Sequence, residues 1–235
     1  MVGKEKLTEL RNKHVLIAGL GGVGAYAAEQ LCRAGVGEMT IVDGDAYHAS
    51  NINRQLGALH STLGESKTEV MARRLRDINP DVELHPIDEF IRDDRMVELL
   101  KNHHYDFVVD AIDTLSPKIF LIYHCVQLGL PIVSSMGAGG KTDPTKITIA
   151  DLSKSYNCKL AYHLRKRLRK LGVKKGVQVI FSAEKMDDEA VVVDNPGPNK
   201  KSTVGTISYM PPLFGGFMAS VVLRNFLATV NEQIA

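Results

Sequence analysis

The fold is decided by residues 14–24, which read HVLIAGLGGVG. The apolar, β-branched first half of this stretch predicts a buried strand. The glycines that follow, Gly19, Gly21, Gly22 and Gly24, predict a tight turn into a helix, where the backbone can approach a phosphate group. We therefore expect a strand, a turn and a helix arranged to hold a nucleotide. Taken alone, the motif also fits a tight turn that binds no ligand.

Short apolar segments alternate with longer helical segments from residue 14 to residue 137, which is the pattern of βαβ units. Strands are expected at residues 14–20, 39–43, 82–87, 107–111, 131–135, 147–151 and 177–182. Helices are expected at residues 23–34, 67–78, 95–102 and 118–128. The sequence thus predicts an α/β fold with a doubly wound, mostly parallel, Rossmann-like sheet that is extended by additional strands and helices in the C-terminal third. We expect a single domain over residues 1–235, with a nucleotide-binding core at 14–137 and a substrate-facing extension at 138–235.

The composition is that of a soluble globular protein, with 44% hydrophobic and 24% charged residues. Cys32, Cys125 and Cys158 lie far apart, so neither a zinc clamp nor a disulfide framework is expected, and reduced thiols favour the cytoplasm. The polar N-terminus lacks the apolar region of a secretory signal. Residues 209–227 are apolar, but prolines, glycines and an arginine interrupt them, so we expect a core helix and no stable membrane association.

Polar residues after the glycine turn extend the nucleotide hypothesis. Asp43 ends the second strand, where its carboxylate could bond both hydroxyls of a ribose, as in an NAD dehydrogenase. Arg54 and Lys67 are two cations on different elements, suited to holding the phosphates of a nucleotide triphosphate, and Asn51 could orient them or bond a phosphate oxygen. Taken singly, the arginine also fits a surface ion pair and the lysine a solvated helix residue.

A further acidic motif, Asp110-Ala111-Ile112-Asp113, closes the fourth strand. Ligands of open α/β sheets bind at the carboxyl ends of the strands, so this motif is expected beside the glycine turn. Asp113 could hold Mg²⁺ there, or it could cap the helix that follows.

The motifs GxGGxG, DxD, NxxRQ, GxxK and DxxD, taken in this order, resemble the ThiF/MoeB family of ubiquitin-activating-enzyme-like adenylating proteins over residues 14–150. The resemblance implies that ATP activates a carboxylate as an acyl-adenylate and releases pyrophosphate. It implies catalytic roles for Arg54, Lys67 and Asp113, and a Mg²⁺ ligand at Asp113. It implies nucleotide contacts from Gly19, Gly21, Gly22, Gly24, Asp43, Asp45, Asn51, Arg54, Gln55, Lys67, Ala111, Ile112 and Asp113.

A basic segment lies in the C-terminal half. Residues 154–175 contain nine of the 29 basic residues of a chain whose net charge is only +2, and they contain no acid. Leucines at helical spacing (Leu160, Leu164, Leu168, Leu171) predict an amphipathic helix with its leucine face in the core. The opposite face suits a phosphate backbone, although a solvated helix face is the simpler alternative. The expected nucleic-acid contacts are Lys159, Arg165, Lys166, Arg167, Arg169 and Lys170.

Residues 134–144, 179–182 and 205–211, together with the basic helix, resemble the tRNA threonylcarbamoyladenosine dehydratase branch of the family over nearly the whole chain. That resemblance implies activation of the threonyl carboxylate of the modified adenosine, which then closes into a cyclic form. It also implies tRNA as the partner, a homodimer, and a sulfur-relay protein as a further partner. Because only thirteen residues precede the first expected strand, Arg11 is not assigned the role of an arginine donated across a dimer.

Two other functions stay open. One is adenylation of a Gly-Gly-ended sulfur-carrier or ubiquitin-like protein, although the CxxC zinc pairs usual in such enzymes are absent. The other is a non-catalytic module that binds a nucleotide and tRNA. Residues 194–209 have turn chemistry without periodicity, so we expect a loop there that could act as a lid.

Overall fold

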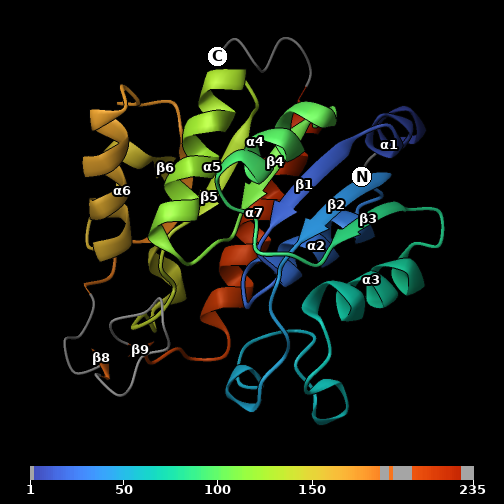
Figure 1. The fold of residues 1–235 in the computed structure, drawn as a ribbon, viewed down its shortest axis with the longest axis horizontal. Helices are drawn as coiled ribbons and strands as arrows, with labels where there is room; N and C mark the ends of the chain where they lie inside the picture. The colour runs from blue at the N-terminus through green and yellow to red at the C-terminus, as the bar shows by residue number, and fades with distance from the viewer. Residues whose placement is uncertain (1–2, 186–190, 193–202, 229–235) are drawn as a thin grey trace.

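A seven-stranded sheet forms the centre of the molecule, in the order β3-β2-β1-β4-β5-β7-β6 (Figure 1). The computed structural model describes residues 3–185, 191–192 and 203–228. All neighbouring strands of this sheet pair in parallel except β6, which runs antiparallel to β7. The strands are β1 (His14–Ala18), β2 (Glu38–Val42), β3 (Glu83–Ile87), β4 (Phe107–Asp110), β5 (Ile132–Ser135), β6 (Ile147–Asp151) and β7 (Gln178–Ser182). A separate pair consists of β8 (Val191–Val192) and β9 (Thr203–Val204).

Helices cover both faces of the sheet (Figure 1). They are α1 (Lys4–Arg11), α2 (Gly24–Arg33), α3 (Lys67–Ile78), α4 (Asp93–Asn102), α5 (Leu115–Leu128), α6 (Lys159–Lys170) and α7 (Met210–Leu227). Short 3-10 turns are η1 (Ala49–Asn51), η2 (His60–Thr62), η3 (Pro144–Lys146) and η4 (Leu152–Lys154).

The alternation of side chains along β1 separates two apolar cores, because successive residues of a strand point to opposite faces. Val15 and Ile17 pack with α2, α3 and α7. Leu16 and Ala18 pack with α4, α5 and α6. Both faces of the strand are buried, which explains why its sequence is continuously apolar. The predicted doubly wound, mostly parallel α/β sheet is confirmed.

The apolar helix α7 is a core element, as the sequence predicts. Phe214, Met218 and Val222 are completely buried. A Cβ atom added at Gly215 would come within 2.5 Å of the Val23 carbonyl oxygen, so this helix packs directly against the start of α2. Over the residues that the structure describes, no helix combines the length and the apolar character needed to cross a membrane.

The structure departs from the predicted elements in two places. Helix α1 was not predicted, because its sequence is polar and only Leu10 is buried in it. Leu171 was expected on the core face of the basic helix, but it is exposed because the helix ends at Lys170. The chain then turns back, and Val173 takes the buried place while its N–H bonds the Leu168 carbonyl at 2.9 Å.

The loop predicted at residues 194–209 is described only in part. Residues 194–202 lie outside the described residues. Residues 203–209 contain β9 and a turn that leads into α7, so the described part of this stretch is not purely irregular.

Candidate nucleotide site

The glycine turn lies where the connections of the sheet reverse direction. Since β1 has β2 on one side and β4 on the other, the carboxyl ends of β1 and β4 flank a crevice of the kind that binds ligands in open α/β sheets. Gly19 has a φ of +92°, and a Cβ atom there would lie 2.8 Å from the Ala111 carbonyl oxygen. A Cβ atom at Gly24 would lie 1.8 Å from the Gly19 carbonyl oxygen. Only glycine fits at both positions, so the turn is packed tightly onto the loop after β4.

Asp43 ties the glycine turn to the end of β2. Its Oδ2 accepts a hydrogen bond from the Leu20 backbone N–H at 2.7 Å, and its Oδ1 accepts one from the Asp45 N–H at 3.0 Å. Burial raises the pKa of Asp43, and the charge of Lys67 and the two backbone N–H groups only partly offset this effect. A carboxylate has about four acceptor positions, so bonds to two further hydroxyls remain available to it.

Lys67 approaches the same corner from the start of α3. Its side chain is buried, and its Nζ donates to Asp45 Oδ2 at 2.6 Å. Burial raises the pKa of Asp45, but the hydrogen bond and charge of Lys67, with the Ala46 N–H, outweigh burial and lower it. Lys67 therefore bonds Asp45, and the Asp45 N–H bonds Asp43, which is the carboxylate that accepts from the glycine turn.

Arg54 and Gln55 lie against the glycine turn from a third direction. A Cβ atom added at Gly22 would come within 3.3 Å of Arg54 Cγ, and one at Gly21 within 3.7 Å of Gln55 Nε2. The Arg54 guanidinium donates from Nη1 to the Ser50 carbonyl oxygen at 2.9 Å and to Asn53 Oδ1 at 2.8 Å. Gln55 Oε1 is buried and has no hydrogen-bond partner, which leaves a polar atom of this turn unsatisfied.

Asn51 builds the turn that carries these two side chains. It is buried, its Oδ1 accepts from the His48 N–H at 3.1 Å, and its carbonyl accepts from the N–H groups of Arg54 and Gln55 at 3.0 and 2.9 Å. Its contacts are those of a residue that positions Arg54.

The structure adds one residue that sequence reasoning missed, Lys118, and gives Asp110 of the DxxD motif a partner. The two form a completely buried ion pair, with Nζ 2.8 Å from Oδ2. Ser134 donates to the same carboxylate at 2.6 Å, and the Ile112 N–H bonds its other oxygen at 3.1 Å. Lys118 also donates to the Ile112 carbonyl at 2.9 Å. The signal was a single lysine within the apolar stretch of a helix.

This buried pair shapes the loop of residues 110–113, which contacts Gly19 through Ala111. Asp113 lies at the end of that loop, with an exposed side chain. The structure therefore gathers the turn, Asp43, Asp45, Arg54 and Lys67 at one corner, and the loop bearing Asp113 adjoins it.

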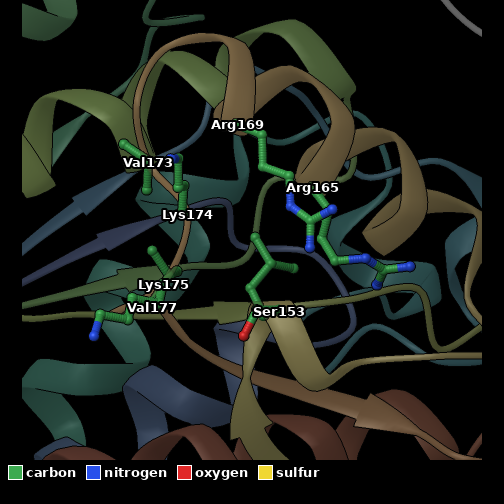
Figure 2. A pocket seen from close by; sticks show the side chains of 8 residues that line it. Ser153, Arg165, Arg169, Val173, Lys174, Lys175 and Val177 are labelled. Atoms are coloured by element: carbon green, nitrogen blue, oxygen red, sulfur yellow. The ribbon is translucent and has the colours of Figure 1, made fainter.

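The basic helix lies apart from this corner, in the layer with α4 and α5. Lys159, Lys166, Arg167, Arg169 and Lys170 are exposed on α6. Arg165 is half-buried, and its Nη1 donates to the Ser155 carbonyl oxygen at 2.7 Å. Figure 2 shows a small basic pocket between the helix and the segment that follows it. Its lining residues are Leu152, Ser153, Arg165, Arg169, Val173, Lys174, Lys175 and Val177.

Residues 204–211 run between the loop after β5 and the glycine turn. The Thr206 carbonyl accepts from Asn53 Nδ2 at 3.0 Å, and Tyr209 donates its hydroxyl to the Thr142 carbonyl at 2.7 Å. Pro211 Cβ would lie 3.1 Å from a Cβ atom at Gly22. One short segment thus contacts both the nucleotide corner and the extension of the sheet.

Comparisons with known proteins show the family of this chain. The model of the ThiF family matches residues 1–235. A tRNA threonylcarbamoyladenosine dehydratase from Bacillus subtilis is 42% identical over 226 residues, which are 94% of this chain and 86% of the relative. The crystal structure of the Escherichia coli tRNA N6-threonylcarbamoyladenosine dehydratase TcdA in complex with ATP matches with a TM-score of 0.88 and 36% identity, covering 98% of this chain and 92% of that one.

A molybdopterin-synthase adenylyltransferase from Salmonella typhimurium is less similar, with 32% identity over 156 residues, which are 66% of this chain and 61% of the relative. The two dehydratases from Bacillus subtilis and Escherichia coli match this chain over 94% and 98% of its length. The chain therefore belongs to the ThiF family and, within it, to the tRNA threonylcarbamoyladenosine dehydratase branch.

Proposed function

We propose that the protein is an ATP-dependent dehydratase that adenylates the carboxylate of threonylcarbamoyladenosine in tRNA and lets the product cyclise. The observation that supports this proposal is that the Arg54 side chain lies beside Gly22, and that Lys67 bonds Asp45, whose N–H bonds Asp43 at the same glycine turn. The near full-length similarity to dehydratases directs the choice of carboxylate.

The corner fits the charges of ATP. Gly21 and Gly22 leave the backbone bare at the amino end of α2, where N–H groups and the helix dipole favour phosphate. In this proposal Asp43 binds the ribose hydroxyls, and Arg54 and Lys67 contact the phosphates. An anionic carboxylate must approach an anionic α-phosphate, so these two cations lower the repulsion and stabilise the departing pyrophosphate. Because Arg54 now bonds its own turn, its guanidinium must exchange those carbonyl and amide contacts for phosphate oxygens.

Asp113 is the residue that we propose for Mg²⁺. It offers an exposed carboxylate, the hard oxygen ligand that Mg²⁺ prefers, on a loop fixed against the glycine turn. When bound, Mg²⁺ would add positive charge beside the phosphates. The buried Asp110–Lys118 pair holds the start of this loop in place.

The reaction balances without a protein nucleophile. The substrate carboxylate attacks the α-phosphorus, and the bond to pyrophosphate breaks. A nucleophile of the same nucleoside then attacks the acyl carbon and gives up its proton to solvent, and AMP leaves with one oxygen of the former carboxylate. The nucleoside therefore loses one water in total, and no cysteine is required.

We propose that residues 14–137 bind the nucleotide and that residues 138–235 face tRNA. The exposed cations of α6 supply the charge that a phosphate backbone needs. A homodimer, a cytoplasmic location and a sulfur-relay partner are proposals supported by the family resemblance.

The test is a nucleoside mass assay. The full chain is incubated with ATP, Mg²⁺ and tRNA bearing threonylcarbamoyladenosine. The tRNA is then digested to nucleosides, whose masses are measured by mass spectrometry. We expect the loss of one water, and we expect Lys67→Ala to reduce the rate at least about a hundredfold, while Lys101→Ala, a substitution of an exposed lysine on α4, leaves it unchanged.

Three outcomes would oppose the proposal. An unchanged nucleoside mass beside an active control enzyme would reject the dehydratase. Pyrophosphate exchange that depends on a Gly-Gly-ended carrier protein, and not on tRNA, would favour the sulfur-carrier alternative. ATP binding without any turnover would favour the non-catalytic module.

A further inference from the structure

Two histidines and a glutamate lie close together at the amino ends of β1, β2 and β3. The register explains the cluster: His14 is the partner of Glu38, Glu38 is the partner of Glu83, and His85 lies two residues beyond Glu83 on the same face of β3. Because these strands run parallel, the nucleotide corner lies at their carboxyl ends, after Ala18. The cluster is therefore separate from the proposed chemistry.

The donor atoms point toward one another. His14 Nδ1 is 3.2 Å and His85 Nε2 is 2.9 Å from the same oxygen of Glu38. All three residues offer donor atoms within 4.8 Å of one another. Tetrahedral zinc with bonds near 2 Å holds its ligands about 3.3–3.5 Å apart. Small movements of two side chains that are each about one-third exposed, 35% for Glu38 and 36% for His85, would bring the three atoms onto one ion.

The ring of His14 is already oriented for such a role. Its Nε2 lies 2.9 Å from the hydroxyl of Thr40, which is buried, as is His14 itself. When Nε2–H donates to this hydroxyl, Nδ1 presents its lone pair toward Glu38. A hydrogen bond from the second ring nitrogen is the usual support of a metal-binding histidine. The Tyr105 ring, 4.6 Å from the His14 ring between centroids, packs against it and limits its rotation.

We infer that His14, Glu38 and His85 form a zinc-binding site that joins the first three strands at their amino ends. Two imidazole nitrogens and one carboxylate are a donor set that suits zinc and does not suit magnesium or calcium. A fourth position is open to water or to Glu83, whose Oε1 is 3.6 Å from His85 Nε2 and whose side chain is 70% exposed. The ion would add a further link between three strands that already meet through backbone hydrogen bonds and through the side-chain contacts of His14, Glu38 and His85.

The experiment is a zinc titration of the full chain after chelator treatment and removal of the chelator, followed by calorimetry. We expect one zinc ion per chain, and we expect His85→Ala and Glu38→Gln each to weaken the affinity at least about tenfold. Zinc should also raise the thermal midpoint of the wild type and not that of His85→Ala. Circular dichroism without metal checks that both variants are folded.

Two matched variants define the site. His104→Ala removes an exposed histidine near the same edge, outside the cluster, and should bind zinc as the wild type does. Asp113→Asn should also leave zinc binding unchanged, since it lies in the proposed magnesium site. The inference is overturned if no stoichiometric binding occurs, if His85→Ala binds as tightly as the wild type, or if Asp113→Asn abolishes binding. None of these readouts depends on ATP or tRNA.

Discussion

At the scale of single residues, the ion pair of Asp110 and Lys118 makes the sharpest prediction. Both side chains are completely buried, so removing one partner leaves an uncompensated charge in the core. We expect Lys118→Met to lower the free energy of unfolding by about 3–5 kcal/mol, measured by urea denaturation. A loss below about 1 kcal/mol would mean that water reaches the carboxylate in the variant.

The double variant Asp110→Asn with Lys118→Met separates charge from packing. It should recover part of the lost stability, because no buried charge remains. The recovery should be incomplete, since Asp110 also accepts hydrogen bonds from Ser134 and from the Ile112 N–H. Both variants should weaken ATP binding as well, because they loosen the loop that contacts Gly19.

At the scale of elements, Glu29 links α2 to α3 and makes stability depend on pH. It is buried and bonds Arg33 at 2.9 Å and Arg74 at 2.6 Å. Burial raises the pKa of Glu29, but the hydrogen bonds and charges of the two arginines outweigh burial and lower it below 4.5. The stability that comes from this lowered pKa is fully present when the pH is above the pKa of Glu29 in the unfolded chain. It is lost as the pH falls through the pKa of Glu29 in the folded protein.

We therefore expect Glu29→Gln to be less stable than the wild type at pH 7, on the order of 2 kcal/mol, in thermal or urea unfolding. The difference should narrow as the pH falls below 4.5. Glu69→Gln, which changes an exposed glutamate of α3, is the matched control and should show no such narrowing. A difference that stays constant into acid would contradict the ion-pair explanation.

Helix α6 makes a second prediction at this scale. Arg169 and Lys170 are exposed, whereas Arg165 bonds the Ser155 carbonyl. We expect the pair of changes Arg169→Ala and Lys170→Ala to weaken tRNA binding and to reduce the salt slope by on the order of 0.7–0.9 for each phosphate that is no longer neutralised. ATP binding should not change. Filter binding across a salt series measures both effects, and an unaltered slope would mean that tRNA binds to another surface.

Arg165→Ala is the contrasting variant of the same helix. Since its guanidinium satisfies a carbonyl of the preceding loop, we expect its main effect to be a lower thermal midpoint rather than a changed salt slope. A slope change as large as that of the double variant would show that this arginine also reaches tRNA.

At the scale of the whole molecule, local patterns explain why most of the fold could be predicted. The apolar run of β1, the glycine turn and the leucine spacing of α6 each carry their information within a few residues. Helix α1 was missed because eight mostly polar residues give no periodic signal, and Leu171 was misplaced because a helix end depends on how the next turn packs.

The candidate site was predictable to a similar extent. Arg54, Lys67 and Asp43 were recognisable because a family motif gathers them. Their contacts were not, since the bond from Lys67 to Asp45 and the approach of Arg54 to Gly22 depend on how separate elements pack. The cluster of His14 with Glu38 and His85 depends on strand registers that no local pattern encodes. The pairing of Lys118 with Asp110 depends on how the start of α5 packs against the end of β4.

The contact of Ala111 with two glycines also limits which sequences this architecture accepts. A Cβ atom at Gly24 would lie 3.0 Å from Ala111 Cβ, and Gly19 meets the carbonyl of the same alanine. A side chain on residue 24 would therefore collide with Ala111, and a side chain on residue 19 would collide with the Ala111 carbonyl. A library randomised at positions 19 and 24 and selected for ATP binding should yield only glycine at both, so these two codons in the gene are restricted by a loop that lies far along the chain.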